Sequence, residues 1–92
     1  MIRSFKLKGL KLFFEKGICS GIQAKHRGKL RLQLSALQTA QYIEDMDLPG
    51  YNLHLLKGQR KDFWSITVNG NWRMTFVFDD GDAYIVNYED YH

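Results

Sequence analysis

Apolar residues recur at helical spacing between residues 7 and 14, and charged residues occupy most of the positions between them. This pattern gives one apolar face and one charged face, which predicts an amphipathic helix packed against a core. Gly17 follows the pattern and is expected to end the helix as a C-terminal cap. A short strand over Ile2–Phe5 is expected before the helix.

A second helical pattern follows, in which Leu30, Leu34 and Leu37 share one face. It predicts a helix from about Ala24 to Tyr42. Residues 30–34 also alternate between apolar and polar, which would suit a strand, but the length of the surrounding pattern favours the helix.

The sequence becomes strand-like after the turn at Leu48-Pro49-Gly50. Segments rich in aromatic and β-branched residues predict four strands, at residues 51–56, 63–68, 72–78 and 83–88. Asn69-Gly70 and Asp80-Gly81 are pairs that type I′ hairpin turns prefer, because both central residues need a positive φ. We therefore expect an α+β fold, in which an N-terminal short strand and two helices pack on one face of a mainly antiparallel sheet of four to five strands.

Pairing across these two turns predicts which side chains share a face of the sheet. With both turn dipeptides in loops, Arg73 pairs with Ile66 on one side and with Tyr88 on the other. One face then contains Asn71, Arg73, Tyr84, Tyr88, Asp90 and His92, with Trp64 and Ile66 beside them. The other face, expected under the helices, contains Phe63, Ser65, Trp72, Met74, Phe76 and Ile85. A slip of one residue at either turn would exchange the faces.

Composition limits the class of protein. The 92 residues are 45% hydrophobic and 25% charged, with a single cysteine, Cys19. These values suit one globular domain over residues 1–92 without a disulfide framework. No apolar run approaches the roughly 18 residues that span a bilayer, and the basic N-terminus has no secretory signal pattern. We expect a soluble cytoplasmic protein. No spacing of His and Cys resembles a zinc site, so no metal is expected.

Charge is distributed unevenly along the chain. Residues 1–31 contain nine Lys and Arg residues against Glu15 alone, whereas residues 32–92 contain four against nine acidic residues. This asymmetry suggests that the N-terminal half meets a polyanion, either nucleic acid or an acidic protein. The alternative is a pair of solvated helices whose lysines keep the protein in solution.

The polar face predicted from the hairpins has the groups that phosphate chemistry needs. Arg73 offers a fixed cation to a phosphate, His92 can give or take a proton near neutral pH, and Asp90 can orient the histidine or act as a base. RNA suits this set because its own 2′-OH is the nucleophile. Each residue also has a plainer interpretation: Arg73 pairs with Glu89 or Asp90 on the surface, His54 is half-buried, and residues 57–62 form a solvated loop.

Several motifs together resemble the HigB-type toxins of the RelE superfamily. They are Leu56-Lys57-Gly58, Phe63-Trp64-Ser65-Ile66, Asn71-Trp72-Arg73-Met74-Thr75-Phe76, Asp82-Ala83-Tyr84 and Asn87-Tyr88-Glu89-Asp90-Tyr91-His92. The opening Ile2-Arg3-Ser4-Phe5-Lys6, Gly9-Leu10 and Phe14-Glu15-Lys16-Gly17 also resemble this family. The similarity spans nearly the whole chain, and its most specific part is the closing Tyr-Glu-Asp-Tyr-His.

The resemblance implies the toxin of a type II toxin–antitoxin pair with a microbial-RNase-like fold. Such toxins cut mRNA in the ribosomal A site without a metal or other cofactor, leaving a 2′,3′-cyclic phosphate and a 5′-OH. The implied partners are a HigA-like helix-turn-helix antitoxin, the ribosome with its rRNA and A-site mRNA, and operator DNA through the antitoxin complex only. No membrane partner is implied.

Matching the family's motifs also implies the site residues. The catalytic set falls on His54, Lys57, Arg73, Asp90, Tyr91 and His92, with Asn71 as a substrate-binding neighbour. The basic residues expected to dock on rRNA are Lys8, Lys11, Lys25, Arg27, Lys29 and Arg31. Strand alternation sends Tyr91 to the face opposite Arg73, and Lys57 is expected beyond the end of the strand that carries His54. The competing hypotheses are a non-enzymatic basic module that binds RNA or protein, and an RNase that needs no ribosome.

Overall fold

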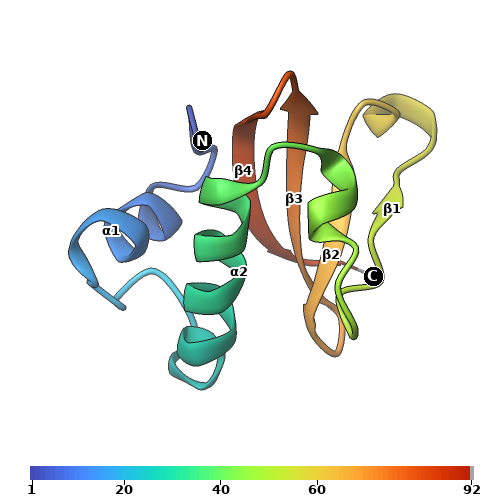
Figure 1. Ribbon diagram of the computed structural model, residues 1–92. Coiled ribbons are helices and arrows are strands. Elements are labelled where there is room, and N and C mark those ends of the chain that lie inside the picture. The colour runs from blue at the N-terminus through green and yellow to red at the C-terminus, as the bar shows by residue number, and fades with distance from the viewer. Residues whose placement is uncertain (92) are drawn as a thin grey trace.

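Two helices cover one face of a four-stranded antiparallel sheet in the computed structural model, which describes residues 1–91 (Figure 1). The sheet contains β1 (His54–Leu55), β2 (Trp64–Asn69), β3 (Trp72–Asp79) and β4 (Asp82–Asp90), in sequence order. The core lies between the two layers, where buried leucines of the helices meet Ile66, Met74 and Phe76 of the sheet. The predicted α+β class and its layering are confirmed.

The first helix, α1, spans Lys8–Lys16 and buries Leu10 and Phe13, as its apolar period predicts. Gly17 has a φ of 71° and donates its N–H toward the carbonyls of Leu12 and Phe13, so the predicted cap is confirmed.

The second helix is shorter than predicted. A 3-10 turn, η1 (Ala24–His26), leads into α2 (Arg27–Thr39), which buries the three leucines of the predicted face. The chain then becomes extended and enters a second 3-10 turn, η2 (Ile43–Met46). The Asp45 carboxylate accepts the backbone N–H groups of Gln41 and Tyr42, at 3.0 and 3.1 Å. These donors are therefore satisfied outside a helix, and the predicted end at Tyr42 is wrong.

The N-terminal segment pairs with β4 but forms no regular strand. Ile2 and Phe5 make two isolated parallel bridges, to Ala83 and Val86. Between them the Ser4 hydroxyl accepts the N–H of Ile85 at 2.8 Å. The expected short strand is therefore reduced to two bridges.

The hairpin between β2 and β3 has a different register from the predicted one. Its turn residues are Gly70 and Asn71, and Asn69 pairs with Trp72. A bulge on β2 between Thr67 and Asn69 then places Thr67, rather than Ile66, opposite Arg73.

The next hairpin begins as predicted, because Asp80 and Gly81 both have positive φ (49° and 81°). The register then changes, with Val77 opposite Tyr84 but Thr75 opposite Asn87, so β4 contains one extra residue. Ile85, at φ 56°, lies in this bulge. Beyond it Arg73 faces Glu89 instead of Tyr88.

The two bulges change the predicted membership of the faces. Ile66, Met74 and Tyr88 lie in one cross-strand row on the helix side, and Thr67, Arg73 and Glu89 form a row on the other face. The predicted grouping of Arg73 with Trp64, Ile66, Tyr88 and Asp90 is therefore wrong. Ser65, expected under the helices, belongs to the open face instead. Among the described residues no helix is long and apolar enough to cross a membrane.

Candidate active site

The face of the sheet turned away from the helices carries a continuous set of polar residues. One row contains His54, Ser65, Thr75 and Asn87, and the neighbouring row contains Thr67, Arg73 and Glu89. Below we call this surface the open face. His54, Arg73 and several residues that the sequence did not single out therefore share one side of the sheet.

Asn71, Arg73 and Tyr91 gather at one end of the β3–β4 hairpin. The Tyr91 N–H donates to the Asn71 carbonyl at 2.8 Å, which extends the pairing one step past β4. The Arg73 guanidinium folds back and donates to the carbonyls of Gly70 and Trp72, at 2.5 and 3.2 Å. None of the ion pairs between described residues includes Arg73, so no carboxylate among these residues neutralises its charge.

Two other predicted site residues, Asp90 and Tyr91, lie on different sides of the sheet from those predicted. Asp90 lies opposite Trp72, in a row of the helix side, so its predicted place on the face of Arg73 is wrong. Tyr91 is half-exposed, and its N–H continues the pairing of β4 with the Asn71 carbonyl. Because Asp90 lies on the helix side, alternation places Tyr91 on the same side as Glu89 and Arg73, so the prediction that it lies on the opposite side is wrong as well. His92 lies outside the described residues.

His54 is exposed on the edge strand, and one of its ring nitrogens is already bonded. Nδ1 lies 2.9 Å from the Asn52 carbonyl oxygen, which can only accept a hydrogen bond. Nδ1 is therefore the protonated nitrogen of the neutral ring, and Nε2 keeps a lone pair directed elsewhere. This arrangement leaves Nε2 as the ring nitrogen that can accept a hydrogen bond.

Lys57 lies beyond the end of β1, as predicted. It precedes η3 (Gly58–Arg60), is extended, and is exposed. Like Arg73, it belongs to none of the ion pairs between described residues, so its ammonium group is available to an anion.

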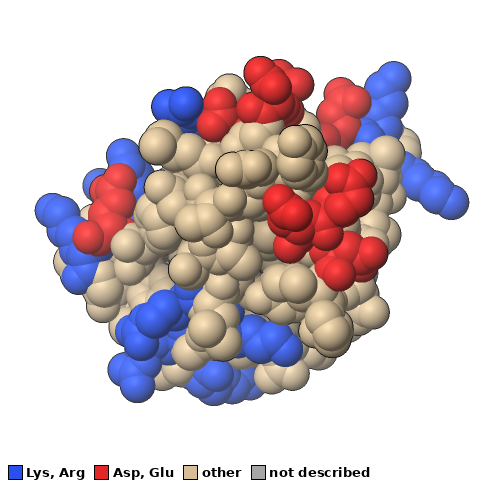
Figure 2. Space-filling view, in the orientation of Figure 1, with Lys and Arg blue, Asp and Glu red and all other residues tan. Residues whose placement is uncertain are grey.

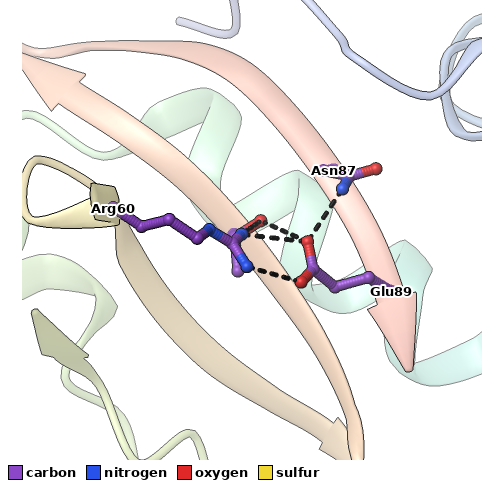
Figure 3. Close-up of polar contacts among 4 residues, drawn as sticks. Arg60, Asn87 and Glu89 are labelled. Carbon is purple, nitrogen blue, oxygen red and sulfur yellow. Dashed lines mark hydrogen bonds and ion pairs between the residues drawn. The ribbon is translucent and has the colours of Figure 1, made fainter. Parts of the chain in front are cut away.

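A partly buried ionic network spans the open face between η3 and β4 (Figure 3). The Arg60 guanidinium binds both carboxylate oxygens of Glu89, at 2.7 and 3.0 Å. Thr75 accepts a bond from Arg60 at 3.2 Å, and Asn87 donates to Glu89 at 2.8 Å. The side chain of Arg60 also lies over the ring of Phe63. Ser65 and Thr75 are fully buried although they face away from the helices, and Thr75 is part of the network.

The titration of this pair reflects its contacts. The hydrogen bond from Arg60 lowers the pKa of Glu89, helped by the charge of Arg60 and by bonds from Asn87 and Thr75, and opposed by burial. The hydrogen bond to Glu89 likewise raises the pKa of Arg60, against the effect of burial. Both partners are thus held in their charged forms.

Sequence analysis missed this network. A solvated loop was the plainer interpretation offered for residues 57–62, and a surface pair with Arg73 was the one offered for Glu89. Glu89 lies in a strand rich in aromatic residues, and a carboxylate that is partly buried there is expected to pair with a cation, because burying an unpaired charge is costly. The choice of Arg60 as that cation depends on the bulge in β4, which the sequence pattern did not reveal.

The predicted docking residues are all exposed. They are Lys8 and Lys11 in α1, Lys25 in η1, and Arg27, Lys29 and Arg31 in α2. Figure 2 shows basic side chains at the left and bottom of the view, over α1 and the first turns of α2, and further ones at the upper left and upper right. Acidic side chains gather near η2 and at the top, near the turn of the β3–β4 hairpin (Figure 2). Among the described residues no three His, Cys, Asp or Glu side chains form a group that could hold a metal ion.

Comparisons with known proteins agree on the relationship of the chain. A family model described as "RelE-like toxin of type II toxin-antitoxin system HigB" matches residues 3–92. A curated protein from Proteus vulgaris, named Endoribonuclease HigB, is 55% identical over 92 residues, and the match covers 100% of both chains. The solution structure of a conserved hypothetical protein from Helicobacter pylori superposes with a TM-score of 0.52 at 16% identity, over 97% of this chain and 96% of that one, which shows the fold alone. The chain therefore belongs to the HigB-like family of RelE-like toxins of type II toxin–antitoxin systems.

Proposed function

We propose that this HigB-like toxin is an endoribonuclease that cuts mRNA on the ribosome and thereby stops translation and growth. The observation that carries the proposal is the Arg73 guanidinium, unpaired with any carboxylate among the described residues, beside Asn71 and Tyr91 at one end of the open face. The 55% identity to a protein named as an endoribonuclease supports the same activity.

The chemistry that suits these side chains is attack by the RNA's own 2′-OH on the adjacent phosphate. The O–P bond to the next nucleotide breaks, which leaves a 2′,3′-cyclic phosphate and a 5′-OH. Such a reaction needs a base for the 2′-OH proton, an acid for the leaving oxygen, and cations for the charge that develops on the phosphate.

Each predicted catalytic residue has a role in this scheme. Arg73 and Lys57 bind the scissile phosphate, since both cations are free of ion pairs among the described residues. Asp90 or His92 acts as the base, and the other is the acid or orients it. Asp90 is the last residue of β4 and lies on the helix side, so as the base it would act on RNA that passes the end of this strand. His54, through its unprotonated Nε2, and Tyr91 position the RNA or relay protons.

The exposed basic residues of α1, η1 and α2 dock the protein on ribosomal RNA. Because rRNA holds mRNA in a fixed path, docking would place the scissile bond in a reactive geometry that a small open site cannot impose alone. This activity belongs to the cytoplasm. The antitoxin is a HigA-like helix-turn-helix protein, and operator DNA is reached only through the complex with it.

Cleavage assays with purified components test the proposal. Wild-type protein should cut mRNA in the presence of ribosomes and leave free mRNA intact, and its induced expression should arrest growth. Arg73→Ala and Lys57→Ala should each cut far more slowly while remaining folded, and Arg3→Ala, at a site remote from Arg73, should behave as wild type.

The competing functions predict different results. A non-enzymatic RNA-binding or protein-binding module would leave mRNA intact in every condition. A ribosome-independent RNase would cut free mRNA as fast as ribosome-bound mRNA. Full toxicity of a folded Arg73→Ala protein would refute the assigned site.

A further inference from the structure

The segment that carries His54 and Lys57 is attached to the sheet by few contacts. β1 pairs with β2 at two positions only, and η3, which follows Lys57, has no buried residue. Leu56 is the buried apolar residue of this segment, and its N–H donates to the Phe63 carbonyl at 2.8 Å. Apolar packing therefore fixes the segment at one point and leaves its far end to polar contacts.

Arg60 supplies the polar contact at that far end. It is the last residue of η3, and it reaches across the open face to Glu89, the residue immediately before Asp90 (Figure 3). Glu89 is fixed in turn by Thr75, at 3.3 Å, and by Asn87. The pair therefore joins two segments, 54–60 and 89–91, which contain most of the predicted catalytic residues.

We propose that Arg60 and Glu89 act as one positioning unit, which sets the place of His54 and Lys57 relative to Asp90 and Tyr91 around the bound RNA. The inference rests on the endoribonuclease function proposed above. Neither Arg60 nor Glu89 is a catalytic residue in this account, because each acts through its neighbours in the chain.

The contacts argue against a role for Arg60 as a phosphate ligand. Its guanidinium is engaged by both oxygens of one carboxylate and by the Thr75 hydroxyl, so an incoming phosphate would have to displace them. Arg73 and Lys57 offer cations without that cost, since no ion pair between described residues includes them.

The bidentate contact between Arg60 and Glu89 also distinguishes this pair from an ordinary surface ion pair. An exposed pair contributes little to stability and leaves its segments mobile. Here the side chains are 37% and 24% exposed, and two parallel bonds fix the relative orientation of the groups they join. A displacement of a catalytic group by about 1 Å can slow a reaction about 100-fold. We therefore expect the pair to affect the cleavage rate by orienting the two segments that it joins.

A double-mutant cycle on cleavage tests the unit. The variants are Arg60→Met, Glu89→Gln and the two combined, each assayed in single-turnover cleavage of ribosome-bound mRNA. We expect each single change to lower the maximal rate by about 10- to 100-fold and to leave the half-saturating concentration unchanged. The double variant should be no slower than the slower single variant, because the second change removes nothing further. The matched control is the pair Arg3–Asp82, at 3.1 Å, whose variants Arg3→Met and Asp82→Asn should cut at the wild-type rate.

Amide hydrogen exchange provides a readout that does not depend on activity. The Phe63 N–H donates to the Arg60 carbonyl at 2.9 Å, so loosening of η3 should speed its exchange in both single variants. Glu89→Gln is nearly isosteric, and it decides the matter if Arg60→Met fails to fold.

Three outcomes would overturn the inference. They are wild-type cleavage rates in both folded single variants, losses that multiply in the double variant, and a raised half-saturating concentration with an unchanged maximal rate. Failure of the proposed function would look different, because the wild-type protein itself would then cut no RNA. In that case, unchanged Phe63 exchange in the variants would still refute the positioning unit, and faster exchange would support it.

Discussion

His26 is a buried imidazole on the helix side of the sheet, behind the candidate site. It is 1% exposed, lies against the rings of Trp72 and Tyr88, and is 2.5 Å from the Tyr88 hydroxyl through Nδ1. Its Nε2 has no hydrogen-bond partner among the described residues. Burial, and to a lesser extent the charge of Lys25, lowers the pKa of His26. The ring is therefore neutral in the folded protein at neutral pH.

The lowered pKa of His26 predicts a loss of stability in mild acid. In the unfolded chain the imidazole is protonated around its ordinary pKa of 6.5, whereas in the folded chain it stays neutral to lower pH. The contribution of His26 to the free energy of unfolding is therefore fully present above pH 6.5. It falls as the pH drops toward the lowered pKa of the folded state. Urea unfolding at pH 7.5 and pH 5.5 should show this decrease in wild type and in the control variant His54→Gln, which leaves His26 in place. His26→Gln should cost about 1–3 kcal/mol at pH 7.5 and lose the pH dependence. A wild-type pH dependence in folded His26→Gln would contradict this assignment.

At the scale of elements, the local patterns were predictable and the pairings between distant segments were not. The burial of Leu10, Phe13 and Leu34 followed from a period of 3.6 residues, and the positive φ of Asp80 followed from turn chemistry. These features depend on neighbours in the sequence.

The bulge in β4 depends instead on contacts from the other end of the chain. The Ser4 hydroxyl satisfies the N–H of Ile85, and the bridges of Ile2 and Phe5 flank the same point. Alternation alone could not reveal one extra residue there, and that residue decides that Glu89, not Tyr88, faces Arg73. The resemblance supplied His54, Lys57 and Arg73 as site residues, but the Arg60–Glu89 contact spans 29 positions and required the structure.

The space around two helical glycines, Gly9 and Gly28, predicts opposite effects of alanine substitution on the stability of the protein. A Cβ on Gly9 of α1 would lie 2.7 Å from the Cα of Gly21, in the connection that leads to α2, and neither backbone can yield easily. Gly9→Ala should therefore destabilise the protein by about 1–3 kcal/mol. Gly28, in the first turn of α2, has open space around its Cα, so Gly28→Ala should stabilise by up to about 1 kcal/mol. Urea unfolding checks both, and equal stability of the Gly9→Ala variant and wild type would show that the two backbones do not meet there.

At the scale of the whole molecule, the predicted docking residues and the predicted catalytic residues occupy different parts of the surface. The exposed basic residues lie on α1, η1 and α2, whereas Arg73 and His54 lie on the sheet face that these helices leave open. One part of the molecule can therefore contact rRNA while another contacts mRNA. The proposed function uses this separation, because docking and cleavage would then involve different surfaces of one small protein.

Docking through the basic helices predicts a steep dependence on salt. Binding to ribosomes should weaken as salt rises, because side chains that bind phosphates release counterions. Lys29→Gln combined with Arg31→Gln should lower the slope of log affinity against log salt by about 1 for each phosphate that the variant no longer binds. Arg3→Gln is the control, since Arg3 is already paired with Asp82. An unchanged slope in the double variant, measured by co-sedimentation, would place the docking surface elsewhere.

The central claim is that the side chains around Arg73 act on a hydroxyl that the RNA itself provides. The most direct test is to map the cut in a ribosome-bound mRNA and then replace the 2′-OH of the nucleotide on its 5′ side with hydrogen. Our account predicts that the unmodified mRNA yields a 2′,3′-cyclic phosphate and a 5′-OH, and that the 2′-deoxy mRNA binds equally well but is not cut at that bond. Cleavage of the 2′-deoxy bond at the same rate, or products that end in a 3′-OH and a 5′-phosphate, would contradict it.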